Sequence, residues 1–204
     1  MTLIEKAQLF ATVAHAAVGQ KRKYSGDDYI VHPVRVARIV KEHGGTDEMI
    51  AAALLHDVIE DTHVSPALIA EEFGWVVFKL VLELTDTSKP EDGNRAVRKG
   101  IDAKRLGMAS EQAQIIKLAD LIDNSADIVA NDPSFAKVFL KEKANLLDIM
   151  TKVQTHSLHA IALGAVKSVE IEAGTPVCNV AGCTPISANK FTVACWISIL
   201  TPGP

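Results

Sequence analysis

The sequence predicts an all-α fold for residues 1–170. Apolar residues recur at the spacing of amphipathic helices in one segment after another, and no segment of this part alternates apolar and polar residues as a half-buried strand does. Polar cap residues, prolines and glycines punctuate these segments where helices start and stop. The chain has 204 residues, of which 48% are apolar and 23% charged, and it can bury an ordinary core as one domain.

The first helix is expected to start at Leu3. Thr2 and Glu5 have the spacing of a capping box, in which each side chain accepts a hydrogen bond from the backbone of the other residue. Apolar side chains then recur at helical spacing as far as Val18, and Gly19 ends the helix.

Further helices follow the same signals. Pro33 is typical of a first helical position, which places His32 at the cap. Ser65 and Pro66 form a similar cap and first turn. The expected helical ranges are 33–43, 47–62, 65–73, 75–84, 95–106, 110–130 and 134–154, with a polar loop at 85–94.

Residues 171–204 differ in character, and we expect them to form a C-terminal tail of unknown role. Glycine, proline, threonine and cysteine recur there, and 191–200 resembles a strand. The cysteines are odd in number and lie away from the histidines of the motif described below, which favours reduced thiols over disulfides or a zinc site. They are Cys178, Cys183 and Cys195.

Charge and hydropathy exclude some classes of function. The net charge of −4 argues against bulk nucleic-acid binding, which favours a basic face. No secretion signal and no membrane-spanning run is visible, so we expect a cytoplasmic protein with no membrane partner. The basic cluster at 21–23 fits either a solvated loop or a contact to nucleotide phosphates. The sequence leaves the oligomeric state open.

The most informative stretch is 51–61, an apolar helix-like run that ends in a histidine and three carboxylates. Helical spacing places His56 and Glu60 on one face, and Asp57 and Asp61 on the adjacent face. Negative charge at a helix C-terminus is unfavourable unless a cation lies against it. The stretch is therefore either a solvated helix end or part of a divalent-metal site.

Two other residues favour the metal site. His32 would be fixed at the start of its helix, and Asp120 is the single aspartate in the apolar helical run 115–122. A buried carboxylate is costly without a partner. With His56 and Asp57 they supply two imidazoles and two carboxylates, a set that suits manganese, iron or zinc. Taken singly, a residue such as His32 is more often a hydrogen-bonded structural residue, and one such as Asp120 is more often a member of a salt bridge.

A longer pattern surrounds these residues. Its segments are GQKRKYSG at 19–26, YIVHP at 29–33, LLHDVIEDT at 54–62, FG at 73–74, and KLAD at 117–120 with Asn124. The order of histidine, histidine-aspartate and aspartate resembles that of the HD phosphohydrolase superfamily. The segments, which extend over about residues 1–150, are similar to the hydrolase domain of RelA/SpoT-type alarmone enzymes. This chain has no room for their later domains and so resembles the small stand-alone alarmone hydrolases.

The resemblance implies a fold, a reaction and a metal. The fold is a helical bundle of the HD-domain type, and the reaction removes the 3′-pyrophosphate of (p)ppGpp to give GDP or GTP and pyrophosphate. The implied cofactor is one Mn²⁺ ion, with zinc or iron as alternatives, and it lowers the pKa of water and polarises a phosphoryl oxygen. The implied metal ligands are His32, His56, Asp57 and Asp120.

The resemblance also implies roles for nearby residues. Glu60 and Asp61 are the expected catalytic carboxylates, at least one of them as a base or as a group that orients water. The expected contacts to a small-molecule nucleotide substrate are Arg22, Lys23 and Asn124.

The sequence departs from the long RelA/SpoT enzymes at three places, and it leaves three alternative functions open. Tyr24, the segment 121–124 and Asp127 differ from the long enzymes, which leaves the preferred base open. Adenosine alarmones are close competitors as substrates. Another HD phosphohydrolase activity, on nucleotides or on NADPH, is the second alternative. The third is a nucleotide-binding regulator that has lost catalysis, and the retained carboxylates argue against it.

Overall fold

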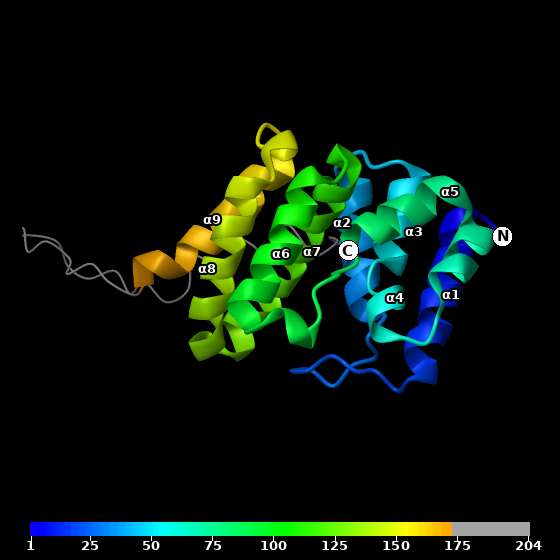
Figure 1. Cartoon of the computed structure of the whole chain (residues 1–204), viewed down its shortest axis with the longest axis horizontal. Helices are drawn as coiled ribbons and strands as arrows, with labels where there is room; N and C mark the ends of the chain where they lie inside the picture. The colour runs from blue at the N-terminus through cyan, green and yellow to red at the C-terminus, as the bar shows by residue number, and fades with distance from the viewer. Residues whose placement is uncertain (173–204) are drawn as a thin grey trace, which may run out of the picture. The chain divides into compact units, whose positions relative to one another are not determined.

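The computed structural model describes residues 1–172, and these are all-α, as the sequence predicts (Figure 1). Within them the only β-type pairing is an isolated bridge between Lys21 and Asp28. The strand-like segment 191–200 and the three cysteines lie outside the described residues, as does all but the start of the predicted tail at 171–204. The division into domain and tail therefore stays a prediction.

The helices alternate with short turns from residue 3 to residue 172. They are α1 (Leu3–Ala17), α2 (Val31–Glu42), α3 (Asp47–Leu55), α4 (Val58–Asp61), α5 (Pro66–Leu84), α6 (Arg95–Met108), α7 (Glu111–Asn131), α8 (Pro133–Ile149) and α9 (Ser157–Glu172), with short 3₁₀ turns η1 (Pro90–Asp92) and η2 (Thr151–Val153). None of the described helices is long and apolar enough to span a membrane.

Side-chain caps explain where most of these helices begin. At α1 the predicted capping box is confirmed, since Thr2 accepts from the backbone N–H of Glu5 and the Glu5 side chain accepts from that of Thr2. The other capping side chains each accept a backbone N–H in the first turn, which would otherwise lack a partner. They are Thr46, Ser65, Asn94, Ser110 and Asp132.

The continuous helix predicted over 47–62 is wrong. Helix α3 ends at Leu55, His56 and Asp57 form a turn, and α4 starts at Val58. Consecutive residues of a regular helix point about 100° apart. The turn, in which Asp57 has φ −98° and ψ −5°, lets the two neighbouring side chains point to the same place. Local alanine and leucine propensity favours helix here, and tertiary contacts override it.

Two other helix boundaries differ from prediction. His32 is not a cap, because α2 starts one residue earlier at Val31, with Ile30 before it. Pro33 is tolerated inside the first turn, where backbone N–H groups need no helical partner. The helix predicted over 134–154 ends instead at Ile149.

Helix α9 was not predicted from the sequence at all. Its side chains Leu158, Ala162 and Val166 are almost fully buried, at the four-residue spacing of one helix face. This face packs against α7 and α8. A weakly amphipathic segment of this kind is stabilised by its tertiary contacts more than by its own sequence pattern.

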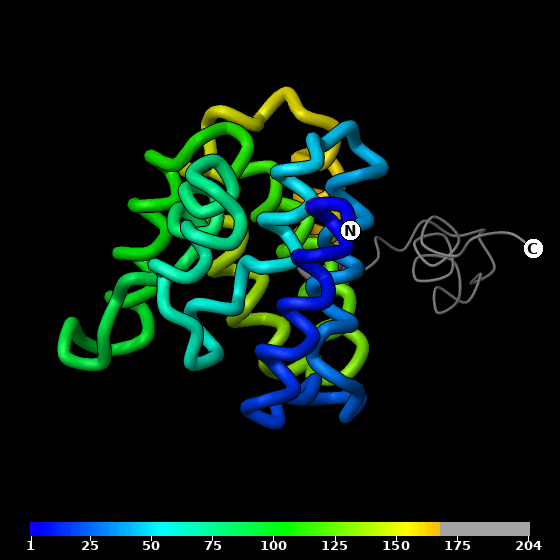
Figure 2. Tube along the Cα trace, turned by 90° about the vertical axis from the view of Figure 1, so that its right-hand side faces the viewer, coloured from blue at the N-terminus to red at the C-terminus, as the bar shows by residue number. Residues whose placement is uncertain are grey.

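Helix α7 is the centre of the domain (Figures 1 and 2). It packs against α2, α3 and α5 on one side and against α6, α8 and α9 on the other, while α3 also packs against α1, α2 and α5. The α7 side chains Ile116, Leu118 and Leu121 are at most 1% exposed. The buried polar residues of this helix, among them Asp120 and Asp123, are therefore held in place between the two groups of helices.

Gly74 divides α5 into two segments, as the predicted helices 65–73 and 75–84 require, although the first segment starts at Pro66. Its φ of 76° and ψ of 172° lie outside the helical region and in a region that is essentially restricted to glycine. A Cβ added at Gly74 would meet no atom within 4 Å. The constraint on this position is therefore the backbone conformation and not space.

We expect Gly74→Ala to lower the free energy of unfolding by about 1–3 kcal/mol because alanine is strained in this conformation. Gly100→Ala is the matched control, since Gly100 lies within α6 and an added Cβ there also meets no atom within 4 Å. That substitution should stabilise by about 0.5–1 kcal/mol. Urea unfolding of the three proteins measures both effects, and equal stability of the two variants would contradict the prediction.

Candidate active site

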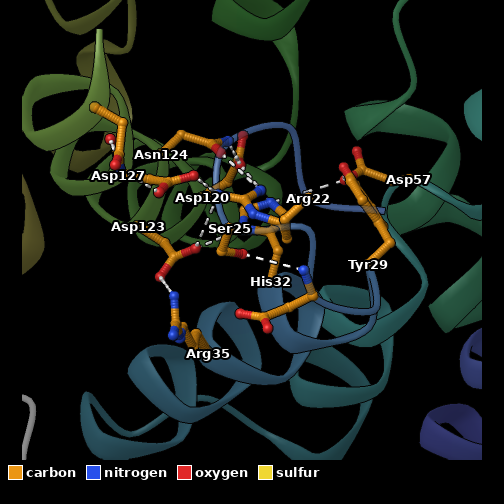
Figure 3. Close-up of polar contacts among 12 residues, drawn as sticks. Arg22, Ser25, Tyr29, His32, Arg35, Asp57, Asp120, Asp123, Asn124 and Asp127 are labelled. Carbon is orange, nitrogen blue, oxygen red and sulfur yellow. Dashed lines mark hydrogen bonds and ion pairs between the residues drawn. The ribbon is translucent and has the colours of Figure 1, made fainter. Parts of the chain in front are cut away.

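The four predicted metal ligands meet where α2, the turn between α3 and α4, and α7 come together. Figure 3 shows three of them, His32, Asp57 and Asp120. His32 Nε2 lies 3.1 Å from Asp120 Oδ1, and His56 Nε2 lies 3.0 Å from Asp57 Oδ2. The two crossed distances, His32 to Asp57 and His56 to Asp120, are both 3.8 Å. Two imidazole nitrogens and two carboxylates thus face one another.

The two imidazoles present lone pairs to this point. His32 and His56 are only 1% and 3% exposed, and each Nδ1 lies 2.7 Å from an acceptor, a carboxylate oxygen of Asp123 or the backbone oxygen of Ala53. Nδ1 must therefore carry the proton of a neutral ring, which leaves a lone pair on Nε2. Neither buried Nε2 makes a hydrogen bond with acceptable geometry. Buried nitrogens without hydrogen bonds, beside carboxylates, fit a divalent metal ion.

Electrostatics also favour a cation here. Burial lowers the pKa of His32, but Asp120 and Asp123 outweigh it and raise the pKa to about 9. Burial opposes ionisation of the carboxylates, yet nearby positive charges hold the pKa of Asp57 and of Asp120 well below its usual range. For Asp57 these charges are the two histidines, and for Asp120 the first is Lys117. The ionised carboxylates favour positive charge between the imidazoles.

Further side chains hold the two carboxylates in place. The Tyr29 hydroxyl donates to Asp57 Oδ2 at 2.6 Å, and Asn124 Nδ2 donates to Asp120 Oδ1 at 2.6 Å. Lys117 Nζ lies 2.8 Å from Asp120 Oδ2. The sequence pattern alone indicated no role for Tyr29 or Lys117. A signal existed for Lys117, which precedes Asp120 by three residues on the same helix face.

The two predicted catalytic carboxylates lie on α4 and bond away from the four predicted ligands. Glu60 Oε1 accepts from the backbone N–H of Asp86 at 2.5 Å, and Asp61 Oδ2 accepts from Gln20 Nε2 at 2.8 Å. Although Glu60 is exposed as a residue, its carboxylate is crowded. Partial burial first, and the charge of Asp86 second, raise the pKa of Glu60 to about 7. A carboxylate with such a pKa can gain and lose a proton near neutral pH.

The predicted nucleotide contacts divide into two groups. Arg22 is 9% exposed, and its guanidinium donates to Asp127 at 2.6 Å and to Asn124 at 3.3 Å (Figure 3). It is therefore anchored on α7, next to Asp120. Lys23 is 72% exposed, and its ammonium lies 3.6 Å from Asp132 and over the ring of Tyr24. The structure brings Arg22 and Asn124 together and leaves Lys23 apart from them.

A small pocket that the sequence analysis did not predict lies between α5, α6, α7 and α8. Its volume is about 50 Å³. The cations of its lining are Lys99, Arg105, Lys117 and Lys143, and the acids are Glu83, Asp86, Asp102 and Glu142. The pocket adjoins the site, because Lys117 also contacts Asp120 and Asp86 also contacts Glu60.

Lys143 is the unusual side chain of this pocket. Burial, followed by repulsion from Lys117, lowers its pKa to about 8. It pairs with no carboxylate in the described part of the chain, and its ammonium lies 5.0 Å from the centre of the Phe139 ring. Its three donor hydrogens are therefore suited to an anion that enters the pocket.

Comparison with known proteins identifies the family. The sequence model of the HD domain matches residues 7–146. The chain belongs to the HD domain family. This membership implies a divalent metal, and in this HD domain the ligand atoms of His32, His56 and Asp57 lie within 4.8 Å of one another. Membership of the family does not specify which divalent metal is bound.

Relatives and a solved structure confirm the RelA/SpoT resemblance. The chain is 35% identical over 147 residues to a probable guanosine-3′,5′-bis(diphosphate) 3′-pyrophosphohydrolase of Synechocystis, covering 71% of this chain and 19% of that one. A protein of the same name from Mycoplasma pneumoniae is 32% identical over 155 residues, covering 72% and 21%. This HD domain thus spans about a fifth of the length of these relatives. The structure of a metazoan SpoT ortholog that hydrolyses ppGpp superposes with a TM-score of 0.72 at 25% identity, covering 83% of this chain and 96% of that one.

The raised pKa of Glu60 predicts a pH-dependent cost to stability. Because the folded pKa of about 7 exceeds the ordinary 4.5, the folded state holds the proton more tightly. The stability that this tighter protonation contributes to the folded state is complete below about pH 4.5 and is lost as the pH rises through about 7. Glu60→Gln removes this pH-dependent contribution. In EDTA, the melting temperature of the variant minus that of wild type should therefore be larger at pH 8 than at pH 4.5.

The matched control is Glu71→Gln, which changes an exposed glutamate of α5. Its melting temperature should differ from wild type by the same amount at both pH values. A constant difference between wild type and Glu60→Gln would contradict the prediction.

Proposed function

We propose that this chain is a metal-dependent pyrophosphohydrolase that removes the 3′-pyrophosphate of (p)ppGpp, giving GDP or GTP and pyrophosphate. The observation that carries the proposal is that His32 and His56 face Asp57 and Asp120, with the ligand atoms of His32, His56 and Asp57 within 4.8 Å of one another. The names of the relatives and the activity of the metazoan SpoT ortholog support the substrate. The proposed location is the cytoplasm.

The proposed metal is Mn²⁺, held by His32, His56, Asp57 and Asp120. A mixed set of nitrogen and oxygen ligands suits manganese, while zinc and iron are the alternatives. When bound, such an ion supplies Lewis acidity to a phosphoryl group and lowers the pKa of water. Lys117, whose ammonium lies 2.8 Å from Asp120 Oδ2, favours the ionised form of that carboxylate independently of the histidines.

In the proposed reaction, a water oxygen attacks the phosphorus next to the ribose 3′ oxygen, and the bond from that phosphorus to the 3′ oxygen breaks. Glu60 accepts the proton that water loses, for which a pKa of about 7 is suited at neutral pH. The 3′ oxygen takes a proton from solvent water and leaves as a hydroxyl group, and Glu60 returns its proton to solvent. Asp61, whose carboxylate is held by Gln20, orients the water.

Nucleotide recognition is assigned to the two sides of Asp120. On one side, Asn124 and Asp127 hold the Arg22 guanidinium next to Asp120, and a guanidinium is a group that bonds to phosphates and stacks on bases. Lys23, on the exposed loop beside Arg22, supplies a more distant positive charge. On the other side, Lys117 leads to the pocket in which Lys143 has free donors. A purine nucleotide with several phosphates matches both features.

The alternatives make different products. Incubation of the purified chain and Mn²⁺ with ppGpp, ppApp, NADPH and deoxynucleoside triphosphates in separate reactions should release pyrophosphate and GDP from ppGpp. Release of pyrophosphate from ppApp alone would select adenosine alarmones, and release of inorganic phosphate from NADPH alone would select the second alternative. A chain that binds Mn²⁺ and turns over none of these is a regulator. Asp120→Ala, which removes one proposed ligand, should lose both metal and turnover.

Arg22→Ala is expected to raise KM for ppGpp by about tenfold or more with little change in kcat. Loss of a hydrogen bond to a charged group costs about 1.5–3 kcal/mol, and a contact of equal strength in ground and transition states acts on KM. The control is Lys21→Ala, because Lys21 is exposed and pairs with Asp28. Steady-state kinetics measures both variants, and an unchanged KM for Arg22→Ala would leave Arg22 as a structural residue of its loop.

A further inference from the structure

The two imidazoles of the site are fixed by different means. His56 Nδ1 lies 2.7 Å from the backbone oxygen of Ala53, three residues earlier in the same segment. His32 Nδ1 instead lies 2.7 Å from the carboxylate of Asp123, which is 91 residues away in the sequence and lies on α7. Both partners of this second bond are buried, at 1% and 8% exposure. The first bond follows from local chain geometry, whereas the second requires a particular side chain.

Helix α7 thus places one carboxylate at each nitrogen of the same ring. Asp120 Oδ1 lies 3.1 Å from His32 Nε2, and Asp123 Oδ2 lies 2.7 Å from His32 Nδ1 (Figure 3). Residues three apart on a helix share a face, so both carboxylates reach the ring from one helix. The ring is held between them and has no other orientation that keeps both contacts.

A third buried carboxylate beside Asp57 and Asp120 is costly unless cations offset it. Asp123 has a cation at each oxygen. Arg35 Nη1 lies 4.0 Å from Oδ1, and Arg22 Nη2 lies 4.0 Å from Oδ2. These arginines come from α2 and from the loop before it, so two separate segments compensate for one carboxylate. An apolar residue at this position would need neither.

We propose that Asp123 is a positioning residue for the metal site: its carboxylate fixes the tautomer and the ring orientation of His32, so that the Nε2 lone pair faces the metal. The inference rests on the proposed metal site and adds a residue to it. Such a carboxylate also makes the imidazole more basic as a ligand, and its loss typically weakens metal binding about 10–100-fold.

The variant that tests this is Asp123→Asn, which keeps the size of the side chain and removes its charge. The amide can donate to Nδ1, which would move the ring proton to Nε2 and block the metal. Isothermal titration with Mn²⁺ should show a Kd about 10–100-fold above wild type. The matched control is Asp148→Asn, which makes the same change at an exposed aspartate of α8. Its Kd for Mn²⁺ should equal that of wild type.

A second measurement needs no variant and covers the case in which Asp123→Asn fails to fold. Long-range ¹H–¹⁵N correlation spectra of the wild-type chain loaded with diamagnetic Zn²⁺ report the tautomer of each histidine. We expect His32 to carry its proton on Nδ1. A proton on Nε2 of His32, or equal Mn²⁺ affinity of wild type and folded Asp123→Asn, would overturn the proposal.

Failure of this inference is distinct from failure of the proposed function. If wild type and Asp123→Asn bind Mn²⁺ equally and wild type hydrolyses ppGpp, then only the role of Asp123 is wrong. If wild type binds neither Mn²⁺ nor Zn²⁺, the metal site itself is wrong and both proposals fall together.

Discussion

The burial of the Asp120 carboxylate in the central helix is the constraint on which the rest of the site depends. The residue is 5% exposed on α7, between fully buried leucine and alanine side chains. An ionised carboxylate in such a place requires compensation from partners that are themselves fixed. Lys117 and Asn124 supply it from the same helix, and His32 supplies it from α2. Because α7 packs against helices on both sides, these partners are held with little freedom.

The turn between α3 and α4 follows from the same requirement. A second carboxylate near Asp120 is repulsive unless positive charge lies beside both, and a metal ion at the two imidazole nitrogens that face them would supply that charge. A regular helix through His56 and Asp57 would direct one of these side chains away, so the chain leaves the helix there. The break also sets α4 apart, which gives Glu60 and Asp61 partners outside the ligand cluster. One local departure from helical geometry thus separates the proposed ligands from the proposed base.

The sequence could predict most of the helices, because they depend on short-range signals. The four proposed metal ligands stay a prediction, and the structure brings their side chains together. Capping residues gave the start of α1, and the glycine after Phe73 gave the division of α5. The break at His56 could not be predicted, since the alanines and leucines before it favour continued helix. The bond from Asp123 to His32 joins residues 91 apart, and the pocket joins four helices. No local pattern encodes contacts of this kind. Helix α9 was missed because its burial, and not its own pattern, stabilises it.

One face of α7 carries the proposed metal and nucleotide functions in order along its length. Asp120, Asp123, Asn124 and Asp127 occupy positions i, i+3, i+4 and i+7, which share a helix face. The first two contact His32, and the last two contact Arg22. Asp127 contacts none of the four proposed ligands. Arg22 Nη2, however, lies 2.6 Å from Asp127 and 4.0 Å from Asp123, so the nucleotide end and the metal end of this face meet at one guanidinium.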